Sequence, residues 1–440
     1  MSAKVRPWRG CGGASLPVRE KQLLGNAAWL LLLQAVNMLL PFITVPYVTR
    51  VFGADGFGVF SIALNWMMYF QLVVEFGFNL SATKRVAEQR RDMAALRSLL
   101  SAVVAARVAL VIVCFGITLA LGALGAATER QISCMFVLFA MLLGVSLQLN
   151  WLFQGLQDMK VITLATACAR AVSVVLIFAL IRSSDQLLLY SLLYSVTFVL
   201  SAAITHWQAW RKHGLRVGPT SVREVWTVLV DGFPLFLSSA AGKVIGNVGV
   251  TVLGAFQSAA VVGSYAAVLK LPQMISLMFS PVGQALYPRV NQLMGNDPRR
   301  AVLLVGKAAA VTLPVFGLCL LAVVALREPL VGLLFGADYV SGADMLIPLS
   351  AWVLLGIVNN FLGVQLLIPL GGQRFYSACM VVDAFAAVAL CVALGAAFGG
   401  MGVASGVAAS ELALTVMLLV GLLRRSGWAR GSVAQSKGRG

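Results

Sequence analysis

Eight ionisable residues lie inside runs of apolar residues. A charged side chain is unfavourable there unless it has a partner or contact with water. The eight residues are Arg107, Arg170, Lys243 and Lys270, with Glu75, Asp231, Asp383 and Glu411. If the runs cross a membrane, each basic residue costs about 2.5–3.5 kcal/mol at a helix centre, so it should face a partner or a water-filled cavity. Ion pairs between the two sets would meet that need. However, three of the acids lie near the ends of their runs and the bases lie nearer the middle. A positively lined cavity therefore accounts for them better, and it implies an anionic substrate.

The residue patterns that bond-making chemistry needs are missing from the sequence. No G-K-[ST] phosphate loop, no G-x-S-x-G turn and no metal-ligand cluster occurs. The seven cysteines form no C-x-x-C pair, and neither histidine lies near them, so we interpret the cysteines as small packing residues. The longest loop on the less basic side, 326–343, is too short to hold a reaction site. We predict a chain that is not an enzyme and that holds no metal.

The composition places the chain in a lipid bilayer. Of its 440 residues 60% are hydrophobic and 11% are charged, against about 45–50% and about 25% in soluble domains. A membrane-spanning helix needs about 20 apolar residues. About twelve such runs can be marked, too long and too uniform for the strands of a membrane barrel. We predict an all-α polytopic membrane protein with spans at 22–46, 57–80, 99–123, 132–153, 161–181, 187–208, 226–252, 259–285, 301–325, 344–369, 375–397 and 401–423.

The basic residues orient these spans. The net charge is +17, and most of the 33 lysines and arginines lie in alternate gaps between the runs and at both ends of the chain. Basic loops face the cytoplasm, so both termini are predicted to be cytoplasmic. The opposite side receives only Arg50, Arg130, Arg182 and Arg327. A nucleic-acid binder would need its basic residues together on one water-facing surface, so we predict no nucleic-acid partner.

A weak internal repeat divides the chain into halves. Gly58–Ser61 resembles Gly263–Ala266, and Gly155–Lys160 resembles Gly371–Tyr376. Each half holds six spans and so enters the membrane from the same side, which predicts a pseudo-twofold axis along the membrane normal and a central cavity between the halves. The predicted organisation is a cytoplasmic N-terminus 1–21, a six-helix bundle 22–208, a cytoplasmic linker 209–225, a second six-helix bundle 226–423 and a basic tail 424–440.

Several segments resemble the bacterial polysaccharide flippases known as Wzx-type O-antigen transporters. The two most specific are Pro41–Gly58 and Glu75–Thr83, and looser matches occur at Asn150–Gly155 and Tyr287–Arg289. The similarity covers about residues 20–425. It implies the fold of the multidrug/oligosaccharidyl-lipid/polysaccharide exporter superfamily, which consists of two six-helix bundles around a central cavity.

The resemblance also implies a function. The substrate would be an undecaprenyl-pyrophosphate-linked sugar repeat unit, moved from the inner to the outer leaflet of the bacterial cytoplasmic (inner) membrane for surface polysaccharide synthesis. Partners would be the lipid bilayer and other polysaccharide assembly proteins. The family's cavity is cationic, and this chain offers Arg50, Arg107, Arg170, Lys243 and Lys270 for that role.

Two other functions stay open at this point. A multidrug or cation antiporter of the same superfamily would favour a cavity dominated by acids. A membrane polymerase or ligase of polysaccharide assembly would need larger outer loops than this chain has.

The acidic residues Glu75, Asp383 and Glu411 are candidates for coupling transport to an H+ or Na+ gradient. A carboxylate in a partly dry cavity can take up and release a proton near neutral pH. Alternatively, these carboxylates neutralise nearby bases and have a structural role. No other cofactor is expected.

Overall fold

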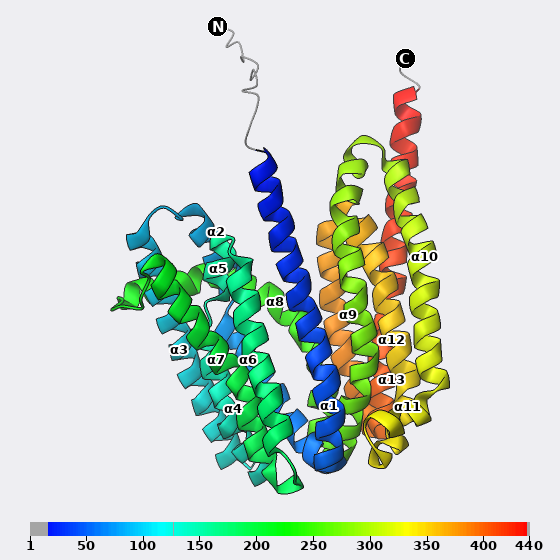
Figure 1. Cartoon of the computed structure of the whole chain (residues 1–440). Helices are drawn as coiled ribbons and strands as arrows, with labels where there is room; N and C mark the ends of the chain where they lie inside the picture. Colours follow the sequence, from blue (N-terminus) through cyan, green and yellow to red (C-terminus); the bar gives the residue numbers. More distant parts are fainter. Residues whose placement is uncertain (1–15, 126, 438–440) are drawn as a thin grey trace.

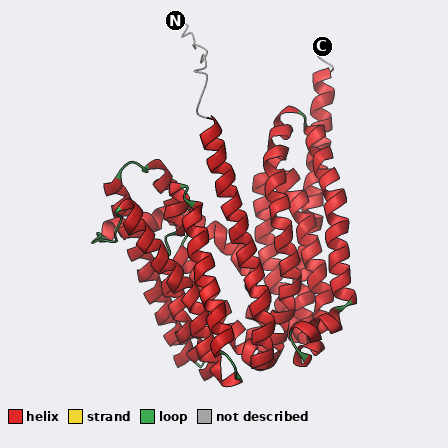
Figure 2. Ribbon diagram, viewed as in Figure 1, coloured by secondary structure: helices red, strands yellow, loops and turns green. Residues whose placement is uncertain are grey.

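The computed structural model describes residues 16–125 and 127–437. Over these ranges the chain consists of helices joined by short loops, with no strand (Figure 2). Each of the predicted apolar runs is helical along most of its length, which confirms the all-α membrane fold. In the described part of the chain, eight helical stretches are long and apolar enough to cross a membrane, and the longest contains several runs. Residues 1–15 and 438–440 of the two predicted cytoplasmic ends lie outside the described residues.

Seven α-helices precede the linker. They are α1 (Leu16–Glu75), α2 (Phe78–Glu88), α3 (Met93–Ala123), α4 (Glu129–Leu147), α5 (Asn150–Leu156), α6 (Met159–Leu180) and, after the short 3-10 turn η1 (Ser184–Gln186), α7 (Leu187–His213). α1 contains two spans because the chain turns at Gly53, whose φ of 63° is readily adopted only by glycine. α1 packs against α4 and α6, and α4 and α6 pack against α7.

The second half of the chain begins with α8 (Val222–Phe256), α9 (Ala259–Asn296) and α10 (Pro298–Ala325). A short hairpin follows, made of α11 (Arg327–Leu334) and the 3-10 segment η2 (Ala337–Met345). α12 (Leu346–Asn359) continues into the π-helical η3 (Asn360–Gly372), so these two form one span. The last helix, α13 (Gln373–Lys437), contains two spans that meet at Gly399, where φ is 58°.

The helices form two bundles, as predicted. Figure 1 shows that the bundles meet at one end of the molecule and stand apart at the other, where the described ends of α1 and α13 both lie. The largest apolar core joins the bundles at the end where they meet. It includes Val48 and Phe60 of α1, Leu253 of α8, Val262 of α9 and Leu346 of α12.

Helix α8 belongs to both bundles. Val228, in its first half, is buried in an apolar cluster formed mainly by α2, α3 and α5 of the N-terminal bundle. Asp231 forms an ion pair with Arg85 of α2, and Gly218 of the linker donates to Ser101 Oγ of α3 at 2.9 Å. The second half of α8 packs against α13 and α9. The predicted domain boundary at residue 226 therefore falls within a helix, and contacts with the N-terminal bundle continue past it.

A capping box fixes the start of α8. The Glu224 carboxylate accepts hydrogen bonds from Ser221 N at 2.9 Å, from Ser98 Oγ at 2.6 Å and from Thr220 Oγ1 at 2.9 Å. The bond from the Ser221 amide and those from the hydroxyls favour the ionised form and lower the pKa of Glu224 to about 2. Glu224 therefore stays ionised at neutral pH and holds α8 to α3.

Candidate functional site

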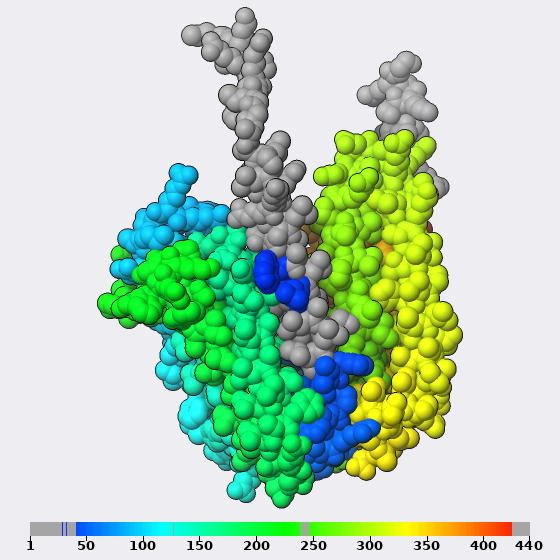
Figure 3. Space-filling model, viewed as in Figure 1, coloured from blue at the N-terminus to red at the C-terminus, as the bar shows by residue number. Residues whose placement is uncertain are grey.

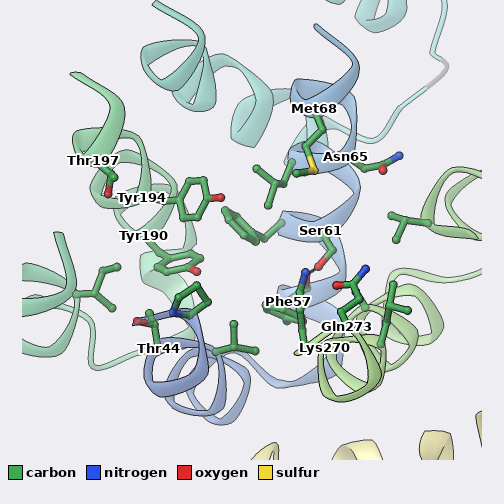
Figure 4. Close-up of a pocket in the computed structure, with 18 of the residues that line it drawn as sticks. Thr44, Phe57, Ser61, Asn65, Met68, Tyr190, Tyr194, Thr197, Lys270 and Gln273 are labelled. Atoms are coloured by element: carbon green, nitrogen blue, oxygen red, sulfur yellow. Dashed lines mark hydrogen bonds between the residues drawn. The ribbon is translucent and has the colours of Figure 1, made fainter. Parts of the chain in front are cut away.

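A cavity of about 290 Å³ lies between the two bundles (Figure 4). One wall comes from α1, α6 and α7, and the other from α8 and α9. None of the described residues that line it is acidic. The polar and basic lining residues are Thr44, Ser61, Asn65, Arg170, Ser173, Tyr190, Tyr194, Thr197, Asn247, Lys270 and Gln273.

Two of the five predicted substrate-binding residues, Arg170 and Lys270, line this cavity, and they do so from opposite bundles. Arg170 lies on α6 and interacts electrostatically with Tyr194 of α7. Lys270 lies on α9, where Figure 4 places it beside Gln273. Both side chains are half-buried, and within the described residues no carboxylate lies within ion-pair distance of Lys270. The cavity therefore has one basic side chain on each wall.

The wall formed by α1 and α7 is aromatic. The ring of Phe60 lies 4.7 Å from that of Tyr190 and 5.5 Å from that of Tyr194, measured between centroids. Tyr194 in turn lies 5.9 Å from Phe198. Aromatic faces beside amide and hydroxyl groups are a surface on which a sugar ring can stack and form hydrogen bonds.

A hydrogen-bond network joins the bundles next to the cavity. Asn65 Nδ2 of α1 donates to Thr251 Oγ1 of α8 at 2.8 Å, and the Tyr69 hydroxyl lies 2.7 Å from the same oxygen. Thr251 donates to the Asn247 carbonyl at 3.0 Å. Asn65 and Asn247 both line the cavity, so its polar wall is continuous with a contact between the bundles.

Below the cavity the two bundles approach so closely that only glycine fits. A Cβ atom at Gly58 of α1 would lie 1.7 Å from the Ala259 carbonyl oxygen of α9. A Cβ atom at Gly263 of α9 would lie 2.0 Å from the Ala54 carbonyl oxygen of α1. Each glycine therefore faces the carbonyl four residues before the other. This reciprocal contact relates the repeat segments that begin at Gly58 and Gly263 by a local twofold, and it seals this end of the molecule.

Arg50 lies outside the cavity, at the sealed end. Its guanidinium donates to the Leu333 carbonyl of α11 across the boundary between the bundles. The neighbouring Thr49 carbonyl accepts a hydrogen bond from the Tyr339 hydroxyl of η2 at 3.2 Å. In this conformation Arg50 therefore fastens α1 to the hairpin of α11 and η2.

Arg107 lies inside the N-terminal bundle, away from the cavity, and is 2% exposed. It donates to the carbonyls of Val145 and Gln148 at 3.4 and 3.1 Å and to Asn79 Oδ1 at 3.0 Å. The two carbonyls belong to the C-terminal end of α4, where backbone acceptors have no helical partner and a positive charge is favourable. Arg107 thus supplies hydrogen-bond donors to the carbonyls that are left free at the break between α4 and α5. This is a structural role.

Two further predicted site residues are Glu75 on α1 and Lys243 on α8. Glu75 accepts a hydrogen bond from Gln71 Nε2 at 2.8 Å and interacts electrostatically with Arg107. It does not line the cavity. Lys243 lies in α8 three residues before the cavity-lining Gly246, and its side chain is outside the described residues.

Asp383 and Glu411 come together in the interior of the C-terminal bundle, on the two spans of α13. Glu411 Oε1 accepts a hydrogen bond from Asn359 Nδ2 at 2.8 Å. Asp383 is 1% exposed, forms a hydrogen bond with Ser410 and interacts electrostatically with Glu411. One Asp383 oxygen has no hydrogen-bond partner among the residues that the structure describes. The same residues contain no group of three or more His, Cys, Asp or Glu side chains placed to hold a metal ion.

Sequence reasoning missed the uncharged part of the cavity. Tyr190, Tyr194, Asn65, Asn247 and Gln273 line it without having been singled out. The available signal was an amide in the middle of an apolar run, as at Asn65, Asn247 and Gln273. That signal is weak because an amide costs less in an apolar setting than a charge does.

Comparisons with known proteins give a consistent result. The sequence profile of the family described as "Polysaccharide biosynthesis protein" matches residues 23–294. A protein of Escherichia coli (strain K12) named "Putative O-antigen transporter" is 24% identical over 401 residues, which cover 90% of this chain and 95% of that protein.

Two solved structures share the fold. The lipid II flippase MurJ, in an inward closed conformation, aligns with a TM-score of 0.72 at 11% identity, covering 91% of this chain and 87% of that one. An inward-facing multidrug resistance MATE family transporter of the MOP superfamily aligns with a TM-score of 0.66 at 17% identity, covering 90% and 96%. At these identities the likeness is one of fold.

Proposed function

Because the chain belongs to the family of polysaccharide biosynthesis proteins, we propose that it flips undecaprenyl-pyrophosphate-linked oligosaccharide repeat units from the inner to the outer leaflet of a bacterial cytoplasmic membrane. The observation that carries the proposal is the pair of basic side chains, Arg170 and Lys270, on opposite walls of one cavity between the bundles. The E. coli relative, which is named as an O-antigen transporter, and the fold shared with a lipid II flippase support a substrate of this class.

The chemistry of the cavity matches such a head group. A pyrophosphate carries about two negative charges, and charge-assisted hydrogen bonds from fixed cations compensate for its lost hydration. Because the described lining contains two bases and no acid, the cavity suits an anion better than the cationic drugs of an antiporter. Asn65, Asn247 and Gln273 can donate to sugar hydroxyls, while the polyprenyl tail stays in the lipid.

The direction of transport is favourable without ATP. With both termini in the cytoplasm, as the loop charges favour, the cavity of this conformation serves the inner leaflet. An anion that moves outward gains about 2.3 kcal/mol per charge for each 100 mV of membrane potential. Closure around the head group and opening of the sealed end would then complete one cycle of alternating access.

Arg170→Ala and Lys270→Ala are each expected to weaken binding of undecaprenyl pyrophosphate about 10- to 100-fold, the loss of a hydrogen bond to a charged group. The measurements are the affinity of the purified protein for undecaprenyl pyrophosphate and the rate of flipping of the lipid-linked oligosaccharide in proteoliposomes. Lys270→Arg should retain most of the activity because it keeps the charge.

Lys307→Ala serves as the matched control, because Lys307 is an exposed base on α10 and does not line the cavity. It should leave both quantities unchanged. Native flipping rates in both Arg170→Ala and Lys270→Ala would contradict the proposed role of the cavity.

We further propose that Asp383 and Glu411 bind the coupling ion, H+ or Na+, and that Glu75 is the alternative site in the N-terminal bundle. The support is a buried carboxylate, Asp383, that interacts electrostatically with the half-buried Glu411, with one Asp383 oxygen free of a described partner. Two carboxylates that repel each other inside a helix bundle are stabilised when a proton or a cation reduces their repulsion.

Asp383→Asn or Glu411→Gln is expected to abolish accumulation of substrate against its gradient while exchange down the gradient persists. The measurement is flipping in proteoliposomes with an imposed pH or sodium gradient. Glu75→Gln, tested in parallel, should retain the gradient dependence, and so should Glu328→Gln, which removes an exposed carboxylate on α11. A native protein that responds to neither gradient would refute ion coupling, and loss of the response only in Glu75→Gln would move the site to the N-terminal bundle.

A further inference from the structure

Two arginine–tryptophan pairs lie at the end of α7 and in the turn that follows it, and the transport site does not use them. These residues, the Trp-Arg cluster, are Trp207, Trp210, Arg211 and Arg216. The guanidinium carbon of Arg211 lies 5.2 Å from the ring centroid of Trp207, and that of Arg216 lies 4.7 Å from the ring centroid of Trp210. Each arginine thus covers the face of an indole, an arrangement that fixes its orientation.

The backbone turn after α7 builds this cluster. Gly214 adopts a φ of 61° and donates to the Trp210 carbonyl at 2.9 Å, and Leu215 N donates to the Ala209 carbonyl at 3.2 Å. This is the glycine-dependent ending in which the chain reverses over the last helical turn. Leu215 is buried as a result, and Arg216 is brought back over Trp210.

No carboxylate among the described residues compensates the charge of the cluster. Arg211 and Arg216 are exposed, and in the described part of the chain neither has a carboxylate within ion-pair distance. Lys212, the neighbour of Arg211, differs because it forms an ion pair with Asp158 at 2.9 Å. Two exposed guanidinium groups, each on an indole of the same helix end, are therefore available to a ligand outside the protein.

The position of the cluster relative to the membrane indicates which kind of ligand it can meet. It lies at the end of the apolar stretch Ser184–His213, where a spanning helix leaves the hydrocarbon. Trp207 and Trp210 are 47% and 49% exposed, and indoles at this depth lie among lipid head groups. Figure 3 shows the end of α7 and the following linker, in green, at the outer edge of the N-terminal bundle, away from the opening between the bundles.

We propose that the Trp-Arg cluster is a binding site for the phosphate head group of an anionic phospholipid, such as phosphatidylglycerol. The indoles face the upper acyl chain region, and the two arginines donate to the phosphate oxygens, an acceptor that guanidinium groups match in geometry. A zwitterionic lipid presents a cationic amine beside its phosphate and is bound less tightly. The site is separate from the substrate cavity and does not depend on the proposed transport function.

The test is a titration of the purified full chain in detergent with phosphatidylglycerol and, separately, with phosphatidylcholine, followed by native mass spectrometry. The native protein is expected to bind phosphatidylglycerol at least about tenfold more tightly, since each base near an anionic lipid contributes a factor of about five. In Arg211→Gln/Arg216→Gln this preference should fall to near unity. Glycerol phosphate, the head group without a lipid, should not compete at equal concentration.

Lys212→Gln is the matched control and should keep the preference, because Lys212 is already paired. Trp207→Ala/Trp210→Ala should weaken binding of both lipids, which separates the role of the indoles from that of the charges. All these residues are exposed, so the thermal stability of the variants should match that of the native protein. Equal affinity of the native protein for the two lipids, or an unchanged preference in the double arginine variant, would overturn the proposal. Full competition by glycerol phosphate would identify the site as one for soluble phosphates instead.

Discussion

Gly58→Ala is expected to stop transport almost completely, although it adds a single methyl group. That group would lie 1.7 Å from the Ala259 carbonyl oxygen, a backbone atom that cannot move without shifting α9. Overpacking of this kind costs about 1–3 kcal/mol, and here the strain is relieved when the bundles separate. The variant should therefore populate a state in which the end sealed by Gly58 and Gly263 is open. Gly263→Ala should have the same effect from the other side.

The separation can be measured as a distance between spin labels at residues 129 and 341 in a cysteine-free background, since Glu129 and Ser341 are exposed at the sealed end on different bundles. Gly58→Ala should lengthen that distance and reduce flipping at least about tenfold. Gly306→Ala provides the control, because no atom lies within 4 Å of a Cβ added there. Native flipping by Gly58→Ala would show that the contact between the two glycines is not part of the transport cycle.

Arg107→Leu is expected to lower the free energy of unfolding by about 3–5 kcal/mol, the cost of breaking a buried charged network. The leucine would leave the Val145 and Gln148 carbonyls and the Asn79 amide oxygen without their donor. The measurements are the thermal stability of the purified protein and its level in the membrane. Arg107→Lys should recover only part of the loss, because an ammonium group cannot reach all three acceptors as the planar guanidinium does.

The same measurements on Arg170→Leu distinguish the two arginines. That variant should keep its stability and lose affinity for undecaprenyl pyrophosphate, whereas the folded fraction of Arg107→Leu should bind undecaprenyl pyrophosphate normally. If Arg107→Leu were as stable as the native protein and bound undecaprenyl pyrophosphate poorly, Arg107 would contact the substrate in another state of the cycle.

The membrane fold follows from the sequence because a bilayer imposes one simple requirement, an apolar run of sufficient length. The positions at which the helices turn, break or become π-helical do not follow from the sequence. The turn at Gly53 falls between two predicted runs, but the break between α4 and α5 lies inside one run, and η3 is π-helical without any marker in its composition. These features depend on which distant side chains satisfy the freed backbone groups, as Arg107 does for α4.

For a related reason, the sequence predicted only some of the residues of the candidate site. Arg107 and Arg170 look alike as arginines in apolar runs, yet one binds helix carbonyls and the other lines the cavity. Helix rotation and tertiary packing decide between the two, and no local pattern encodes them. Equal numbers of acids and bases suggested ion pairs within this set of eight residues. In the described residues Asp231 is the one acid of the four that forms an ion pair, and its partner, Arg85 of α2, is not one of the four bases.

The shared helix α8 has a consequence for how the chain is assembled during synthesis. The apolar cluster of α2, α3 and α5 is closed by Val228, and α3 gains its bonds to Gly218 and Glu224 only from residues beyond α7. When six spans have emerged from the ribosome, that cluster still has an open side facing the lipid and head groups. The N-terminal bundle is therefore completed by α8, the first helix of the C-terminal bundle. Insertion of this seventh span is thus also the step at which the two halves of the chain become joined.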